Sequence, residues 1–221
     1  MPAPVRLAVV EDRADLRARL VERLALFPEV EVVLASENGA AFFADLGLAP
    51  APPEVVLMDI EMPEMDGVAA TRRLRSERPG VEVIMLTVFD AEDRIAEALG
   101  AGASGYLLKE EPVERVVDAV LELGRGGAPV SGRVARTLVR RVQAGAAREA
   151  AAAAEVEALG LTPREREVLA LIARGETDDG MAAEMGVSPH TVQTHVKSLY
   201  RKLDVHSRGE ASRRAVELGL A

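Results

Sequence analysis

The chain has 221 residues, no cysteine, and 27 basic against 36 acidic side chains, which gives a formal net charge of −9. The lack of cysteine excludes a disulfide-stabilised fold, a thiol nucleophile and a zinc site built on thiolates. The apolar runs are far shorter than the roughly 20 residues that a membrane span needs. Length and composition therefore predict a cytoplasmic protein of one or two domains that has no membrane partner.

The first 127 residues alternate short β-branched runs with amphipathic stretches. The runs predict strands over residues 5–10, 30–34, 55–59, 81–86 and 105–108, and the stretches predict helices over 14–26, 39–46, 68–76, 91–99 and 113–123. Because the strands are apolar at nearly every position, both faces of their sheet must be covered, as in parallel sheets. The pattern predicts an α/β domain over residues 1–127, with a (βα)5 flavodoxin-like, doubly wound parallel sheet.

Residues 128–160 differ in composition from both flanking regions. A basic stretch with Arg133, Arg136, Arg140 and Arg141 leads into an alanine-rich run that has few large apolar side chains. Such a helix is only marginally stable alone. We therefore expect a partly helical linker, whose order depends on docking to a neighbouring surface.

The last segment, residues 161–221, shows no strand pattern and predicts helices over 163–173, 178–185, 189–203 and 207–218. The first helix starts with a capping box, Thr162 to Glu165, and Ser188 with Pro189 gives the third a similar start. Gly186 suits a left-handed helix end, which leaves only a short turn before the third helix. A short helix, a tight turn and a longer helix predict an all-α, four-helix domain of the helix-turn-helix type.

The acidity belongs almost wholly to the first domain. Residues 1–127 carry 13 basic and 24 acidic side chains, whereas residues 161–221 carry 9 of each. Within the second domain, residues 190–214 carry six basic and two acidic side chains. The third helix and its successor therefore present a localised basic face, which is typical of nucleic-acid binding.

Chemically competent side chains follow four of the predicted strands. Glu11 and Asp12 follow the first strand, Asp59 the third, Thr87 the fourth and Lys109 the fifth. Because the carboxyl ends of parallel strands meet at one edge of a sheet, we expect these side chains to share a crevice. Crowded carboxylates repel one another, and a hard cation with oxygen ligands, such as Mg²⁺, would relieve that repulsion.

The carboxylate of Asp59 in this setting is suited to attack a phosphoryl group and form an aspartyl phosphate. Mg²⁺ would neutralise the incoming charge, while Lys109 and the Thr87 hydroxyl would hold phosphoryl oxygens. A simpler interpretation exists for each residue alone: Glu11 and Asp12 cap the next helix, and Lys109 is a solvated strand-end lysine. The joint occurrence at four strand ends favours the shared site.

The segments VVEDRADLR, VVLMDIEMPEMDG, IMLTVFD and GASGYLLK resemble the receiver domain of two-component response regulators, over residues 5–124. The resemblance implies that a sensor histidine kinase is a partner and that Asp59 is the phosphoacceptor. It implies these further roles: Glu11 and Asp12 as the acidic pair, Asp12 and the carbonyl of Glu61 as Mg²⁺ ligands, Thr87 and Lys109 as phosphoryl contacts, and Tyr106 as the aromatic switch.

Three positions near this site have plainer interpretations. Many receivers have proline directly after the lysine, but here two glutamates intervene, so Pro112 is expected to open a helix. Tyr106 is also suited to be a core aromatic side chain on a buried strand. Phe89 is expected to shape the loop after Thr87 rather than to contact a ligand.

The segments LTPREREVLALIARG and MAAEMGVSPHTVQTHVKSLYRKLDVHSR resemble the DNA-binding domain of LuxR-type regulators, over residues 161–208. Together with a receiver, this domain resembles the NarL/FixJ class of transcriptional response regulators. The pairing implies binding to double-stranded promoter DNA as a homodimer when phosphorylated, with RNA polymerase as a further partner. It implies base contacts by Gln193, Thr194 and Lys197, and phosphate contacts by Arg201, Lys202 and Arg208.

Two alternatives stay open at this point. Asp178 and Asp179 open the second helix where related domains have a polar start, and they would repel DNA phosphates, which favours a regulator that acts independently of phosphorylation. An aspartate-nucleophile phosphatase would need a second aspartate two residues after Asp59, but position 61 is glutamate, and no substrate-capping insertion is visible. The protein is therefore expected not to be an enzyme.

Overall fold

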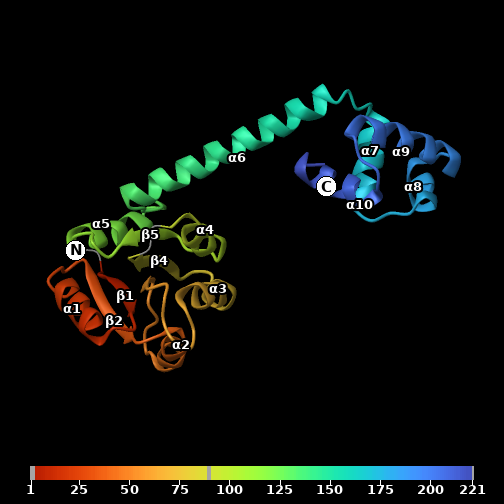
Figure 1. The fold of residues 1–221 in the computed structure, drawn as a ribbon. Helices are drawn as coiled ribbons and strands as arrows, with labels where there is room; N and C mark the ends of the chain where they lie inside the picture. The colour runs from red at the N-terminus through yellow and green to blue at the C-terminus, as the bar shows by residue number, and fades with distance from the viewer. Residues whose placement is uncertain (1–2, 89–90, 221) are drawn as a thin grey trace. The chain divides into compact units, whose positions relative to one another are not determined.

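The computed structural model describes residues 3–88 and 91–220 (Figure 1). The chain divides into two compact units, Met1–Arg141 and Val142–Ala221. Among the described residues, no helix combines the length and the apolar character that crossing a membrane requires.

The first unit contains a sheet of five parallel strands in the order β2-β1-β3-β4-β5. The strands are β1 (Val5–Val10), β2 (Val30–Ser36), β3 (Val55–Met58), β4 (Glu82–Thr87) and β5 (Gly105–Leu108). The helices between and after them are α1 (Ala14–Leu24), α2 (Gly39–Leu48), α3 (Gly67–Glu77), α4 (Glu92–Gly100) and α5 (Val113–Leu123). This strand order is that of flavodoxin-like, doubly wound sheets, so the predicted fold of this unit is confirmed.

Successive residues of each strand pack into two different cores. Leu7 and Val9 of β1 belong to one cluster, which α1 and α5 complete, whereas Ala8 and Val10 belong to another, which α2, α3 and α4 complete. This alternation follows from the strand geometry, because neighbouring side chains point to opposite faces of a sheet. Both faces are thus covered, which explains why the strands are apolar at nearly every position.

The loop after β3 is fixed by a close backbone approach. Asp66 caps α3, because its side chain accepts a hydrogen bond from the amide of Ala69 at 2.7 Å. Gly67 donates its amide to the carbonyl of Ile60 at 2.8 Å, and a Cβ atom at this position would collide with the carbonyl oxygen of Asp59. Only glycine therefore lets α3 start this close to the end of β3.

The chain adds a short segment to the outer edge of β5 after α5. Val130 pairs in parallel with Tyr106, and the next helix, α6 (Gly132–Ala158), buries Val134 completely in the cluster that contains Tyr106. The first unit therefore extends into the region that the sequence assigns to the linker. The segment around Val130 can pair there because β5 is at the edge of the sheet, and an unpaired strand edge offers backbone groups to a following segment.

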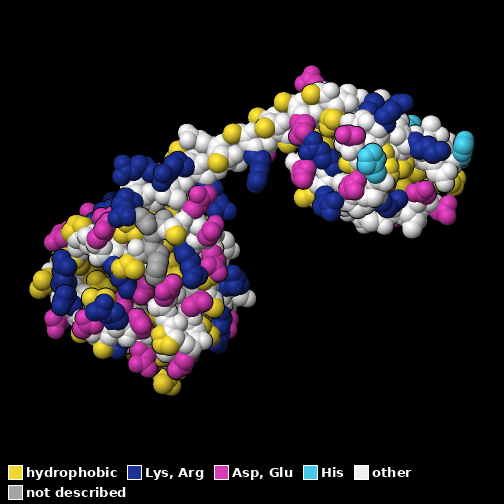
Figure 2. Space-filling model, viewed as in Figure 1, with side chains coloured by type: hydrophobic (Ala, Val, Ile, Leu, Met, Phe, Trp, Pro, Cys, Tyr) yellow, Lys and Arg dark blue, Asp and Glu magenta, His cyan; other side chains and the backbone are white. Residues whose placement is uncertain are grey.

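Helix α6 is continuous over 27 residues and is exposed in its middle, at positions 142–151. Lys and Arg side chains gather over its first half (Figure 2), where the chain has Arg133, Arg136, Arg140 and Arg141. Near its end, Val156 is buried in the core of the second unit. The helix thus docks at both ends, whereas the sequence predicted only a partly helical segment that depends on docking.

The second unit contains α7 (Pro163–Ala173), α8 (Asp178–Met185), α9 (Pro189–Leu203) and α10 (Arg208–Glu217) around one hydrophobic cluster. The predicted caps are confirmed: Thr162 and Glu165 form a capping box, and the Ser188 side chain accepts from the amide of Thr191. Gly186 ends α8 with φ of 66°, in the left-handed region that favours glycine. These local signals explain why the predicted helix ends lie within one residue of the observed ones.

Candidate functional site

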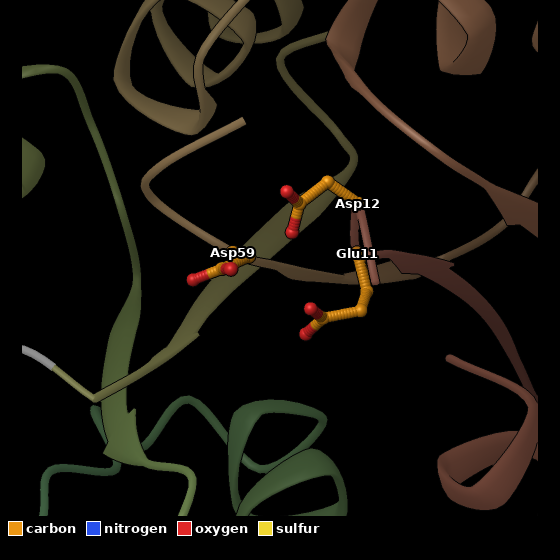
Figure 3. A group of neighbouring side chains, drawn as sticks. All are labelled: Glu11, Asp12 and Asp59. Carbon is orange, nitrogen blue, oxygen red and sulfur yellow. The ribbon is translucent and has the colours of Figure 1, made fainter. Parts of the chain in front are cut away.

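Three carboxylates converge at the carboxyl edge of the sheet. Glu11 and Asp12 follow β1, and Asp59 follows the neighbouring strand β3, so that one carboxylate oxygen from each residue lies within 4.8 Å of the other two (Figure 3). Glu11 and Asp59 are 4% and 6% exposed, whereas Asp12 is open to solvent. The structure thus brings together the acidic residues that the sequence predicted to share a crevice.

Lys109, from the end of β5, reaches into this group. Its Nζ atom lies 2.5 Å from Glu11 Oε2 and 2.7 Å from Asp59 Oδ2. The other oxygen of Asp59, Oδ1, accepts a hydrogen bond from the amide of Ile60 at 2.8 Å. One ammonium group therefore contacts two of the three carboxylates, and the surplus of oxygen ligands and negative charge fits a hard divalent cation such as Mg²⁺.

Burial and ion pairing act in opposite directions on the pKa of Glu11 and on that of Lys109. Burial raises the pKa of Glu11 above its ordinary value, and the hydrogen bond from Lys109 offsets only part of that rise. Burial alone would lower the pKa of Lys109, but the hydrogen bonds and charges of Asp59 and Glu11 outweigh it and raise that pKa. The ammonium group therefore stays charged at neutral pH.

The other predicted receiver residues lie around the group in different ways. Thr87 is fully buried at the end of β4, and its carbonyl accepts the amide of Lys109 at 2.8 Å. Tyr106 is fully buried in the core, the position that its plainer interpretation predicts. The Glu61 side chain points to a partner outside the group, because it pairs with Arg94 at 3.4 Å. Phe89 lies outside the described residues.

Sequence reasoning missed one contributor to the site. The backbone of Gly67, at the start of α3, packs against the carbonyl of Asp59. The close approach depends on how α3 meets β3 in space, and no local sequence pattern encodes it. Any larger residue at position 67 would therefore collide with the backbone of Asp59, the predicted phosphoacceptor.

The second unit presents a polar face on α9. Gln193, Thr194, Lys197 and Arg201 are exposed. The Thr194 hydroxyl donates to the carbonyl of His190 at 3.0 Å, so its own proton is committed to the helix. The arrangement suits a helix that enters a major groove.

Lys202 lies on α9 but is engaged within the unit. Its Nζ atom lies 2.7 Å from Glu165 Oε2 on α7 and donates to the carbonyl of Gly160 at 2.6 Å. Glu165 also accepts from the Thr162 amide at 2.8 Å and from the Ser198 hydroxyl at 2.7 Å. Burial would raise the pKa of Glu165, but these hydrogen bonds lower it to about 2.

Arg208 is engaged in a similar way. It pairs with Asp178 at 3.1 Å and donates to the carbonyl of Glu176. The ion pair with Arg208 compensates the charge of Asp178, one of the two aspartates at the start of α8. Lys202 and Arg208, both predicted to contact phosphates, are therefore held in ion pairs inside the unit, unlike the exposed residues of α9.

Comparison with known proteins agrees with both units. Residues 7–121 match the family model of the response regulator receiver domain, and residues 159–215 match that of bacterial regulatory proteins of the luxR family. Transcriptional regulatory protein LnrK of Bacillus subtilis is 33% identical to the chain, over 98% of this chain and 99% of its own. Probable transcriptional regulatory protein NarL of Mycobacterium tuberculosis is 37% identical, over 95% of this chain and 93% of its own.

Solved structures of response regulators are similar to the chain over most of its length. The response regulator ChrA of a heme-sensing two-component system is similar over the full length of both chains, with a TM-score of 0.53 and 31% identity. A structure of the RcsB response regulator with DNA shares the fold, with a TM-score of 0.56 and 21% identity over 97% of this chain and 98% of that one. With its receiver and its LuxR-type helix-turn-helix domain, the chain belongs to the two-component transcriptional response regulators of the NarL/FixJ class.

Proposed function

We propose that this regulator is controlled by phosphorylation: Asp59 accepts a phosphoryl group from a sensor histidine kinase, and the second unit then binds promoter DNA. The observation that carries the proposal is the convergence of Glu11, Asp12 and Asp59 with Lys109 at one edge of the sheet. We assign the receiver to residues 1–127, the linker to 128–160 and the DNA-binding domain to 161–221, with the start of the linker packed as part of the first unit.

Several residues of the first unit have different roles in the proposed phosphoryl transfer. An oxygen of Asp59 attacks phosphorus, the bond from phosphorus to the imidazole nitrogen of the kinase breaks, and the imidazole leaves. Lys109 already contacts Asp59 and is placed to pair with a phosphoryl oxygen, and Thr87 would contact another. Mg²⁺, held by Asp12, Asp59 and the carbonyl of Glu61 beside Glu11, would neutralise the charge of the incoming group.

The second unit is proposed to read DNA with α9. Gln193, Thr194 and Lys197 would meet base edges, and Arg201 would meet a phosphate, because these side chains are exposed on one helix. Phosphate contacts by Lys202 and Arg208 stay a prediction, and each would require an ion pair to open or be shared. A homodimer would read two half-sites, and contact with RNA polymerase would then set transcription in the cytoplasm.

Phosphoryl transfer is tested by intact mass. The full chain is incubated with Mg²⁺ and acetyl phosphate, and we expect the mass gain of one phosphoryl group. Asp59→Ala should abolish the gain, while Asp118→Ala, which changes an exposed aspartate on α5, should leave it unchanged. A gain that survives Asp59→Ala would rule out this acceptor.

DNA binding is tested by its dependence on salt and on α9. A promoter fragment recovered by sequencing of bound genomic DNA is titrated at several salt concentrations, with and without acetyl phosphate. The logarithm of the binding constant should fall with that of the salt concentration by about 0.9 per phosphate neutralised. Lys197→Ala should weaken binding, and Arg201→Ala should also reduce the salt slope by about one. Unchanged binding in both variants would exclude α9 as the reader.

The structure weakens the motive for the phosphorylation-independent alternative. Asp178, whose charge argued against DNA binding, pairs with Arg208. The phosphatase alternative gains no support, because the side chain of Glu61, which occupies the position of the required acid, pairs with Arg94. Phosphorylation-controlled DNA binding is therefore the function that the arrangement supports best.

A further inference from the structure

The segment that precedes α6 continues the parallel pairing of the sheet. The amide of Tyr106 donates to the carbonyl of Pro129 at 2.9 Å, and the amide of Ser131 donates to the carbonyl of Tyr106 at 2.9 Å. In a parallel ladder the next bond would run from the amide of Leu108 to the carbonyl of Ser131. The pairing thus reaches the residue directly before Lys109.

A side chain replaces the backbone in that next bond. The carbonyl of Ser131 accepts the amide of Ala135 at 2.9 Å, in the first turn of α6. The hydroxyl oxygen of Ser131 accepts the amide of Leu108 instead, at 3.0 Å. Leu108 and Ser131 are 3% and 2% exposed, so water does not compensate readily if this bond is lost.

The first turn of α6 therefore holds the residues on both sides of Lys109. Ser131 holds Leu108 through its hydroxyl, and Arg133 pairs with Glu110 at 2.7 Å. The close approach needs glycine at position 105, since a Cβ atom there would lie 2.9 Å from the carbonyl oxygen of Pro129. The contact is thus built into the sheet rather than made by an exposed loop.

We propose that Ser131 is a positioning residue that couples Lys109 to helix α6. Its hydroxyl fixes the end of β5, so that a shift of Lys109 when Asp59 becomes phosphorylated is passed to the first turn of α6. The inference rests on the proposed function, because it concerns regulation through the same site. Coupling of this kind is reciprocal, so the state of α6 also biases Lys109.

The test compares Ser131→Thr with Ser131→Val in the full chain. The two substitutions introduce side chains of nearly equal shape, and only threonine keeps the hydroxyl. Intact mass gives the phosphoryl occupancy of Asp59 after treatment with Mg²⁺ and acetyl phosphate. Amide hydrogen exchange at Leu108 and over residues 132–138 then reports the hydrogen bond and the response of α6.

Wild type and Ser131→Thr should change their exchange over residues 132–138 on phosphorylation, by at least about threefold. In Ser131→Val we expect the amide of Leu108 to exchange about tenfold faster, and the response of α6 to phosphorylation to be lost while Asp59 still gains the phosphoryl group. Ser131→Ala should behave like Ser131→Val and serves if the larger side chain prevents folding. Thr137→Val, which removes a hydroxyl that bonds within α6, is the control and should respond like wild type.

The possible outcomes separate the two proposals. If wild type gains no phosphoryl group on Asp59, the proposed function fails, and the coupling fails with it. If wild type is phosphorylated and Ser131→Val responds over residues 132–138 as Ser131→Thr does, only the coupling is overturned. Failure of α6 to respond in phosphorylated wild type overturns the coupling as well.

Discussion

Each unit contains a buried glutamate paired with a lysine from another element, but the two pairs differ in what surrounds them. Glu11 shares Lys109 with Asp59, and Asp12 lies within reach of both carboxylates. Glu165, in contrast, accepts hydrogen bonds from Thr162 and Ser198 as well as from Lys202. The first group has too few donors for its carboxylates, and the second has enough.

The pKa of each glutamate follows from this difference. Burial raises the pKa of Glu11, because one lysine does not compensate for it, whereas donors on every side lower that of Glu165 to about 2. A group with surplus negative charge is prepared to bind a cation, whereas a saturated one holds helices together. The surroundings, not the ion pair itself, thus distinguish a chemical site from a structural one.

The largest effect is expected from Lys202→Met. Removing the lysine leaves Glu165 charged and buried with part of its compensation lost. Because Lys202 is partly exposed, we expect the second unit to lose about 2 kcal/mol of unfolding free energy. Lys197→Met, at an exposed position on the same helix, should change stability by less than about 0.5 kcal/mol. Urea unfolding followed by circular dichroism measures both. Equal losses would show that Lys202 has no structural role.

The next effect concerns the acid stability of the second unit. The pKa of Glu165 is about 2 in the folded chain against an ordinary value of 4.5, so its contribution is complete above pH 4.5 and is lost as the pH falls toward 2. Because Lys202 is partly exposed, we expect a loss of about 1–2 kcal/mol over this window. Glu165→Gln should be less stable at pH 7 and should flatten this part of the profile. An unchanged profile would contradict the assignment.

Mg²⁺ should stabilise the first unit and not the second. At ten times its dissociation constant, a ligand that binds only the folded state adds about 1.4 kcal/mol. Thermal unfolding should therefore shift upward with Mg²⁺ in wild type and much less in Asp12→Asn, whose side chain is exposed and contributes little to packing. Asp118→Asn on α5 provides the control. A shift that persists in Asp12→Asn would place the cation elsewhere.

The smallest effect is expected from Glu11→Gln, and its sign should be opposite to that of Glu165→Gln. Without Mg²⁺, the uncharged amide is less costly to bury, is not repelled by Asp59 and can still accept from Lys109, so stability should rise by about 0.5–1 kcal/mol. The variant should also gain less from added Mg²⁺. Differential scanning calorimetry in a chelator and in Mg²⁺ measures both changes. A loss of stability in the chelator would mean that Lys109 already compensates all the carboxylates.

Local signals in the sequence predicted most of the fold. Strands buried on both faces, capping residues such as Thr162 and Ser188, and the left-handed Gly186 are encoded by neighbouring residues. The acidic cluster was also predictable, because strand order alone brings the carboxyl ends of β1 and β3 together. The roles of single residues in phosphorylation are predictions from the family resemblance.

Contacts between elements were not predictable in the same way. Lys202 has the sequence position of a phosphate contact, and only the packing of α9 on α7 brings it to Glu165. Ser131 lies in a segment whose composition indicates a linker, and its bond to Leu108 depends on the free edge of β5. Both cases require distances between elements that lie far apart in sequence.

The exposed middle of α6 has a consequence for how such chains diversify. Side chains at positions 142–151 are all exposed, and the division between the two units falls at the start of this stretch. Genetic recombination within these codons would join a receiver to a different output domain without repacking either hydrophobic interior. Recombination in this alanine-rich stretch would thus exchange one domain and leave the hydrophobic core of the other intact.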